Sequence, residues 1–196
     1  MYEGVDTVVL FEELAYGDVL PIRWQPFAAP LDPIHLESWA EHNLRLLQAC
    51  AAIEEHGTPE KPDDASAHAA DLSRLDLKIN LLLDLVGQLM VEHHPRPAPI
   101  PVRFNAIGAT WRAVGVPPKP RERGCFEIYL RECLAQPLRM VGEIVSVGSD
   151  ALVKARFEYP GESVADLIEK LAFRRHRRQV AGARQPRRGT GGSGNP

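Results

Sequence analysis

The sequence predicts an α+β protein: a small antiparallel β-barrel with a closing C-terminal helix, interrupted by long heptad-patterned helices. Two changes of periodicity predict this architecture. Between about residues 34 and 92 the apolar residues recur at helical spacing, whereas after the proline-rich stretch 95–101 they alternate as in strands. A chain of 196 residues with 44% apolar residues can bury one compact core plus an accessory element.

Charge is divided unevenly along the chain, although the formal net charge is only -3. Residues 1–94 hold 17 acidic and 5 basic side chains, whereas residues 95–196 hold 9 and 18. A basic half can bind nucleic acid, but it can equally attract an acidic partner or an acidic neighbouring subunit. No apolar run is long enough to span a bilayer and the N-terminus lacks a signal-peptide pattern, so we expect a cytoplasmic protein.

The helical part follows a short strand. Val19–Trp24 has strand character, and Pro21 would confine it to a sheet edge or a strand start. The apolar spacing of Ile34–Glu55 predicts a first helix, which Gly57 and Pro59 bring to an end. The two helices are therefore expected to be joined by a polar, exposed linker.

The second helix, from about Ala67 to Glu92, carries the clearest pattern in the chain. Its apolar residues occupy successive a and d positions of a heptad: Leu72, Leu75, Ile79, Leu82, Val86 and Leu89. Two explanations are open, a coiled-coil seam or one amphipathic helix of a globular core. Leu85 at g, with Leu83 and Met90 at e, adds apolar surface beside the seam, so the helix needs cover on several sides. We expect a tetramer built on a central four-helix bundle, with the first helices packed outside it and a dimer as the alternative.

Strand-like segments fill the region after the prolines. Each is bounded by turn-forming residues: Val102–Ala113, Cys125–Arg131, Leu138–Val147 and Leu152–Glu158. Ser163–Gln179 then returns to helical spacing. The expected parts are residues 1–25 with the opening strand, 26–99 as a helical oligomerisation insertion, 100–180 as the rest of the barrel and its helix, and 181–196 as a disordered tail.

The order of these segments resembles a PilZ domain, the small barrel that senses cyclic di-GMP in bacteria. The stretch VRFNAIGATW (Val102–Trp111) is similar to the family's D/N-x-S-x-x-G strand. The stretch LVKARFEYPGESVADLIEKL (Leu152–Leu171) is similar to its last strand and closing helix. The helical insertion after the opening strand further resembles the atypical, self-assembling PilZ branch.

The resemblance also implies a nucleotide site, made of an R-x-x-x-R segment ahead of the barrel and the D/N-x-S-x-x-G turn. Aligning Gly108 with the motif's glycine puts Asn105 at the serine position and Arg103 at the acidic position, which reverses one charge. No Arg or Lys precedes Arg23. The segment ahead of the first strand offers carboxylates instead, which would repel phosphates. We therefore expect cyclic di-GMP to bind weakly or not at all, and we expect no other cofactor.

A basic cluster ends the closing helix, formed by Arg174, Arg175, Arg177 and Arg178. Two interpretations are open: an anion or partner patch, nucleic acid included, or a solvated helix end that complements the helix dipole. No aromatic residues are interleaved for base stacking.

Neither a metal site nor a catalytic centre is predicted. The three cysteines, Cys50, Cys125 and Cys133, form no CxxC pair, and His93 and His94 lack a third ligand at helical spacing. No catalytic or nucleotide-cradling motif occurs, so an enzyme is not expected.

The predicted function is a non-catalytic signalling adaptor of cyclic di-GMP pathways. It would self-assemble and bind an unidentified signalling protein, without inserting into a membrane. The alternative is a nucleic-acid-binding module that uses the basic C-terminus.

Overall fold

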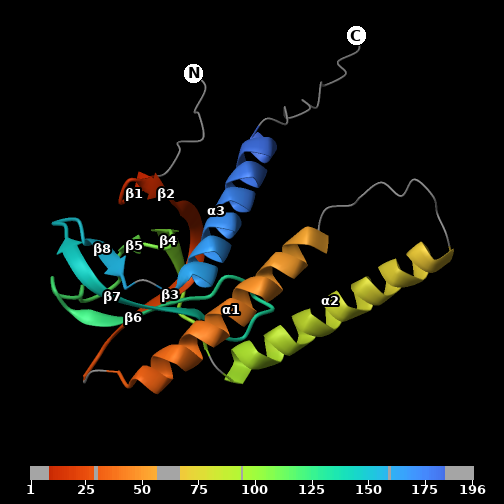
Figure 1. The fold of residues 1–196 in the computed structure, drawn as a ribbon, viewed down its shortest axis with the longest axis horizontal. Helices are drawn as coiled ribbons and strands as arrows, with labels where there is room; N and C mark the ends of the chain where they lie inside the picture. The colour runs from red at the N-terminus through yellow and green to blue at the C-terminus, as the bar shows by residue number, and fades with distance from the viewer. Residues whose placement is uncertain (1–8, 29–30, 57–66, 94, 159, 184–196) are drawn as a thin grey trace, which may run out of the picture.

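The chain folds into a barrel on which its first and third helices pack, while the second helix extends away from it (Figure 1). The computed structural model describes residues 9–28, 31–56, 67–93, 95–158 and 160–183. Within these ranges, six antiparallel strands close in the order β3-β4-β5-β8-β7-β6. Their bounds are β3 (Tyr16–Pro26), β4 (Pro99–Phe104), β5 (Gly108–Arg112), β6 (Arg123–Ile128), β7 (Leu138–Val147) and β8 (Leu152–Phe157). The helices are α1 (Pro33–His56), α2 (Ala67–His93) and α3 (Glu162–Ala183), and β1 (Val9–Leu10) with β2 (Glu13–Leu14) forms a separate small hairpin. The predicted α+β class is confirmed, with its small antiparallel barrel and C-terminal helix.

Aromatic side chains fill the centre of the barrel. The Phe126 ring lies 5.1 Å from the Trp111 ring and 5.4 Å from the Phe157 ring, measured between centroids. Strand alternation sends every second residue inward, which is why Phe126 and Ile128 on β6 are both fully buried. Cys50 of α1 and Cys125 of β6 are also buried, whereas Cys133 is only partly buried.

The segment Val102–Ala113 was predicted as one strand, and this prediction is wrong. It forms the second half of β4 and all of β5, which pair antiparallel with Phe104 opposite Ala109. The reason is the side chain of Asn105, whose Oδ1 accepts hydrogen bonds from the backbone N–H groups of Ile107 and Gly108 at 2.9 and 3.0 Å. Such an Asx turn reverses the chain within three residues.

Pro21 lies in the middle of a closed barrel rather than at an edge or a strand start. It falls where β3 changes partner, because the ladder with β4 ends at Pro21↔Pro99 and the ladder with β6 begins at Ile22↔Ile128. The carbonyl of Pro21 accepts a hydrogen bond from Tyr129 at 3.0 Å. A missing N–H is tolerated at such a junction because neither ladder depends on it.

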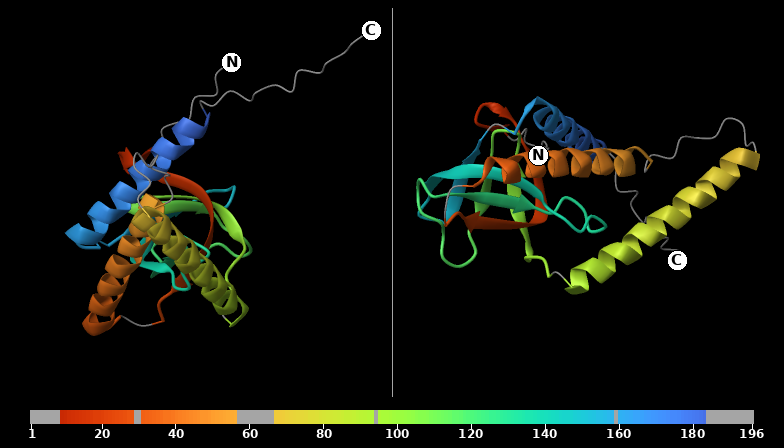
Figure 2. Two further views of the ribbon diagram at one scale, coloured as in Figure 1. Left: turned by 90° about the vertical axis from the view of Figure 1, so that its right-hand side faces the viewer. Right: turned by 60° about the horizontal axis from the view of Figure 1, so that its bottom comes forward.

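Helices α1 and α3 pack on the barrel and on each other, whereas α2 extends away from it (Figure 2). Leu46, Leu47 and Cys50 of α1 are buried on this side. The amide of Asn43 also exchanges two hydrogen bonds with the backbone of Arg139, at 2.7 and 2.9 Å. The buried face of α1 is therefore occupied by its own barrel, which leaves α2 uncovered in the single chain.

The ends of the helices agree closely with the sequence analysis. The first two were predicted over Ile34–Glu55 and about Ala67–Glu92, and the structure has them over Pro33–His56 and Ala67–His93. The closing helix runs to Ala183, beyond the predicted start of the tail at 181. The rest of the predicted tail, residues 184–196, lies outside the described residues.

Candidate functional site

The turn after β4 is built from the residue that the resemblance places at the motif's serine position. Asn105 is 1% exposed. Besides the two backbone N–H groups that its Oδ1 binds, its Nδ2 donates to the carbonyl of Leu10 at 2.8 Å. Both lone pairs and one donor of the amide are therefore used within the chain. Asn105 holds the β4–β5 turn and fastens the β1–β2 hairpin to the barrel, rather than facing a ligand.

The surface over Gly108 is covered by an aromatic ring of the same chain. A Cβ atom on Gly108 would lie 2.3 Å from Cε2 of Phe11 and 2.3 Å from the carbonyl oxygen of Ala155. Phe11 reaches this place because the turn between β1 and β2 is tight, with positive φ values of 52° at Phe11 and 67° at Glu12. The glycine that the resemblance assigns to a nucleotide therefore receives a side chain instead.

Two cations of β8 lie over the Phe11 ring. Lys154 Nζ lies 4.3 Å and Arg156 Cζ lies 4.8 Å from the ring centroid, within the range of cation–π attraction. Sequence analysis did not identify this arrangement. The signal available was weak, a single Phe followed by two glutamates ahead of the barrel. Phe11 and Gly108 are too far apart in the chain to be linked by spacing.

Arg103 has a different environment, since it is exposed on β4. It lines a groove of about 680 Å³ that also contains Gly17, Thr110, Arg112 and His176. Arg112 is paired there with Asp150 at 3.0 Å. Of the three predicted nucleotide-site residues, the structure thus brings Asn105 and Gly108 together under the β1–β2 hairpin and leaves Arg103 at the surface.

The basic cluster of α3 is divided between the interior and the surface. Glu54 of α1 is fully buried and lies 2.7 Å from Nε of Arg175, 3.2 Å from Arg131 and 4.0 Å from Arg174. The carboxylate therefore joins α1 to α3 and to the segment after β6. Arg174 and Arg175, predicted as part of an anion or partner patch, instead form ion pairs within the chain.

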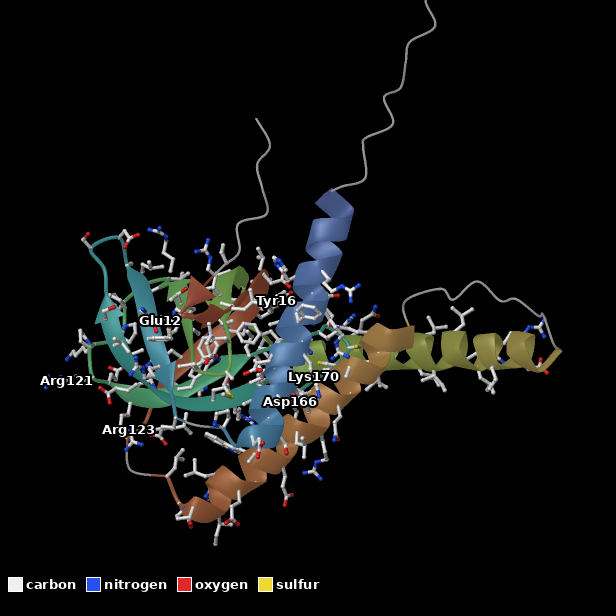
Figure 3. The ribbon with its side chains drawn as sticks, turned by 45° about the horizontal axis from the view of Figure 1, so that its top comes forward. Glu12, Tyr16, Arg121, Arg123, Asp166 and Lys170 are labelled. Carbon is white, nitrogen blue, oxygen red and sulfur yellow. The ribbon has the colours of Figure 1, made fainter. Side chains whose placement is uncertain are left out.

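Arg175 also contacts the first long strand. Its Nη1 donates to the hydroxyl of Tyr16 at 2.9 Å and lies 3.7 Å from Asp18, and Tyr16 donates to Asp18 (Figure 3 shows Tyr16 beside α3). Burial, followed by the hydrogen bond to Asp18, raises the pKa of Tyr16 far above its ordinary value. The tyrosine therefore stays neutral and acts as a hydrogen-bond donor.

A sequence signal for the burial of Glu54 existed, because Leu47, Cys50 and Glu54 share one face of the helix.

Arg177 is the described member of the cluster that faces solvent. Its guanidinium lies 5.8 Å from the ring centroid of Phe173, which is itself 55% exposed. The side chain of Arg178 lies outside the described residues. The three described members of the predicted patch thus do not form a continuous basic surface.

The six heptad residues of α2 all face away from the rest of the chain. Leu72, Leu75, Ile79, Leu82, Val86 and Leu89 are between 52% and 62% exposed. Leu85 at the predicted g position is 49% exposed, and the side chains of Leu83 and Met90 lie outside the described residues. At the other side of the helix, Gly87 is buried against the segment after β6, where a Cβ would lie 2.9 Å from Cys133 Cα and from the carbonyl oxygen of Glu132. This contact anchors α2 to the barrel while its apolar side stays open.

Metal binding and membrane insertion are two further possibilities for the described part of the chain. There, no three His, Cys, Asp or Glu side chains are grouped so that they could hold a metal ion. A helix with the length and hydrophobicity to cross a bilayer is likewise absent from those residues.

Comparisons with known proteins agree with this fold. A crystal structure of a tetrameric PilZ-domain protein from Xanthomonas campestris, described as self-assembled through an unusual helical bundle, matches with a TM-score of 0.66 and 23% identity. The match covers 87% of this chain and 92% of that one. No curated protein matches. The family model described as atypical PilZ domain, cyclic di-GMP receptor, matches residues 47–185, well over half of the chain. The chain therefore belongs to the atypical PilZ domain family.

Proposed function

We propose that this chain is a non-catalytic adaptor of cyclic di-GMP signalling, which self-assembles through α2 and acts through protein partners. Its direct binding of cyclic di-GMP is weak or absent. The observation that carries the proposal is the uncovered apolar surface of α2, and the occupied nucleotide turn supports its second part.

The exposed surface of α2 is too large for an isolated helix. Nine described aliphatic side chains of this helix are between 49% and 71% exposed. Monomeric soluble proteins rarely leave such a continuous apolar surface in water. Burying the exposed half of each of the six heptad residues and of Leu85 would stabilise an assembly by about 1 kcal/mol per side chain, so by about 7 kcal/mol per helix before the costs of association.

A second copy of the chain is the partner that fits this surface best. The a and d positions form one stripe along α2, which is the pattern that helices of a coiled coil or bundle bury against each other. Leu85, at g, is also exposed, and apolar g positions favour burial by more than one neighbouring helix. The Xanthomonas relative is described as tetrameric and assembled through a helical bundle, which supports a tetramer for this chain as well.

The nucleotide turn supports an adaptor rather than a direct receptor. The amide of Asn105 forms its hydrogen bonds with backbone groups, and Phe11 covers Gly108. Arg103 lies where the resemblance expects a carboxylate. No lysine or arginine precedes Arg23 in the chain, so the paired guanidinium groups that would hold phosphates ahead of the barrel are missing.

Light scattering coupled to size exclusion tests the proposal. At tens of micromolar we expect a particle of about 87 kDa, four times the 21.7 kDa of one chain. A particle of about half that mass would support self-assembly as a dimer. A monomer at this concentration would refute the proposed role of α2.

A further inference from the structure

A second surface, at the other end of β3, has no role in the proposed assembly. A groove of about 690 Å³ opens beside Trp24 and Pro26, whereas the Asn105 turn lies beside Tyr16, where Tyr16 pairs with Phe104. The groove is lined by the second half of β3, by the segment that leads into β4, and by the loop between β5 and β6.

One wall of this groove is an open strand edge. The ladder between β3 and β4 ends at Pro21↔Pro99, but β3 continues to Pro26 and is paired there with β6. The N–H and C=O groups of one residue point to the same side of a strand, and those of the next residue point to the opposite side. Because Pro21 and Phe27 bond toward Tyr129 and Arg123 on the β6 side, the N–H and C=O of Trp24 point toward the groove. An open edge of this kind is a template for an added strand.

The opposite wall is apolar and stands in water. Val114 and Val116 are 81% and 95% exposed, and Pro117 and Pro118 follow them in the same loop. Trp111 lines the floor and packs against Trp24 at a centroid distance of 6.1 Å. Concave surfaces with aromatic residues and exposed aliphatic side chains are typical of protein-binding sites.

The rim of the groove carries an excess of positive charge. Arg23, Arg96 and Lys119 line it together with one carboxylate, Glu122, which accepts a hydrogen bond from Trp24 Nε1 at 2.8 Å. The guanidinium of Arg96 donates to three backbone carbonyls, at 2.9 to 3.2 Å, so it is oriented but not neutralised. In the described part of the chain, neither Arg96 nor Lys119 forms an ion pair.

We propose that this groove binds an extended, acidic segment of a partner protein, which adds to the open edge of β3 as an extra strand. Alternate apolar side chains of the segment pack against Val114 and Val116, and its carboxylates face Arg96 and Lys119. The open edge of Ile22–Pro26 spans five residues, about 16 Å of strand, so it accommodates two or three inward-facing side chains. This inference rests on the proposed adaptor role, because it names the chemistry of the partner.

A peptide library provides the test. A phage-displayed library of random linear decapeptides is panned on the full-length chain, and the enriched peptide is labelled with fluorescein for anisotropy titration. We expect enriched peptides to alternate apolar residues and to carry Asp or Glu. Val116→Asp and Lys119→Glu should each weaken binding at least tenfold. Val145→Asp is the matched control, because Val145 is a partly exposed valine on β7, outside the groove, and it should leave the affinity unchanged.

Backbone methylation distinguishes strand addition from simple apolar adhesion. Placing N-methyl groups on alternate peptide amides should abolish binding in one register and leave it unchanged in the other, because only every second amide bonds to β3. Equal effects in both registers would overturn the proposal. So would a library without enriched peptides, or a peptide whose affinity Val116→Asp does not change.

The outcome of the peptide test does not depend on the self-assembly of the chain. Val116 is far from α2 in the sequence, so the Val116→Asp variant should keep the wild-type mass in light scattering. If the chain is a tetramer but enriches no peptide, the groove proposal fails and the self-assembly proposal stands. If it is a monomer that still binds the peptide, the reverse holds.

Discussion

Placing charges on the heptad stripe of α2 provides a direct test of self-assembly. Leu75 and Leu82 occupy successive d positions and are 54% and 60% exposed in the single chain. Replacing both by Asp therefore disturbs little within one chain. In an assembly, the same change puts two carboxylates per helix into a surface that excludes water.

The magnitude follows from these exposures. Burying a leucine side chain fully is worth about 2–3 kcal/mol, so the exposed half of each residue contributes about 1 kcal/mol, or about 2 kcal/mol per helix for the pair. Desolvation of the two carboxylates adds several kcal/mol per helix. Since about 1.4 kcal/mol is a tenfold change in an equilibrium constant, a tetramer should be weakened by many orders of magnitude.

The assay is light scattering of the wild type and of two matched double variants at equal concentration. The Leu75→Asp/Leu82→Asp variant should run as a monomer or dimer and retain the strand signal of the barrel in circular dichroism. Leu77→Asp/Leu81→Asp is the control. Those leucines lie on the same helix at f and c positions and are 71% and 60% exposed, so the charge change is identical but off the stripe. The control should keep the wild-type mass.

Two results would refute the reasoning. One is a Leu75→Asp/Leu82→Asp variant with the mass of the wild type, which would mean that the stripe is not the interface. The other is an equal loss of mass in both variants, which would show that total apolar surface matters rather than heptad position.

Four further outcomes are expected. Calorimetry with cyclic di-GMP should show no binding in the micromolar range, and a sub-micromolar isotherm would contradict the occupied turn. Glu54→Gln should lower the free energy of unfolding in urea by about 3–5 kcal/mol, because it leaves buried guanidinium groups uncompensated. Asp166→Asn, in an exposed ion pair on α3 (Figure 3), should change this free energy by less than about 1 kcal/mol. Equal effects of the two variants would show that the buried ion pairs are not needed. Gly87→Ala should lower the melting temperature, because overpacking costs about 1–3 kcal/mol and helix propensity gains only about 1 kcal/mol. Gly17→Ala should not lower it, because the nearest atom to a Cβ at Gly17 is 3.7 Å away. An unchanged melting temperature of Gly87→Ala would mean that α2 is not anchored at this glycine. Burial raises the pKa of the Cys50 thiol from 9.0 to about 11, so as the pH rises the unfolded chain loses this proton before the folded chain does. The free energy of unfolding should therefore fall as the pH rises above 9, and it should fall less steeply in Cys50→Ala. An equal slope in the wild type and in Cys50→Ala would rule out this thiol as the cause.

The nucleotide turn illustrates how far sequence patterns reach. The charge reversal at Arg103 and the missing basic residues ahead of the barrel were visible in the sequence and predict weak nucleotide binding. The cover that Phe11 places over Gly108 was not, because it depends on a two-residue turn with positive φ values and on cations from β8. Contacts between distant segments leave no periodic signal in the chain.

The basic cluster of α3 is the converse case. Its sequence pattern suggested an exposed charged surface, but two of its arginines form ion pairs with a buried carboxylate. Arg174 and Arg175 sit in a run of arginines that looks solvent-exposed when it is considered as a helix end. Arg175 and Glu54 are 121 residues apart, and only the packing of α1 against α3 brings them to 2.7 Å. The pairing had to follow, because a carboxylate buried on α1 requires a counterion.

The sequence by itself determined the succession of helical and strand regions, the ends of the long helices and the heptad spacing on α2, but not the β1–β2 hairpin or the turn that divides β4 from β5. These features depend on spacing along a short stretch of chain, where helical or strand periodicity is a local property. Tertiary structure alone decided that the apolar face of α1 packs against the barrel, so that α2 remains uncovered. It also decided that β3 exposes an edge where it changes partner at Pro21. Each of these outcomes depends on which distant segments compete for the same surface, and burial of one face by one neighbour excludes every other.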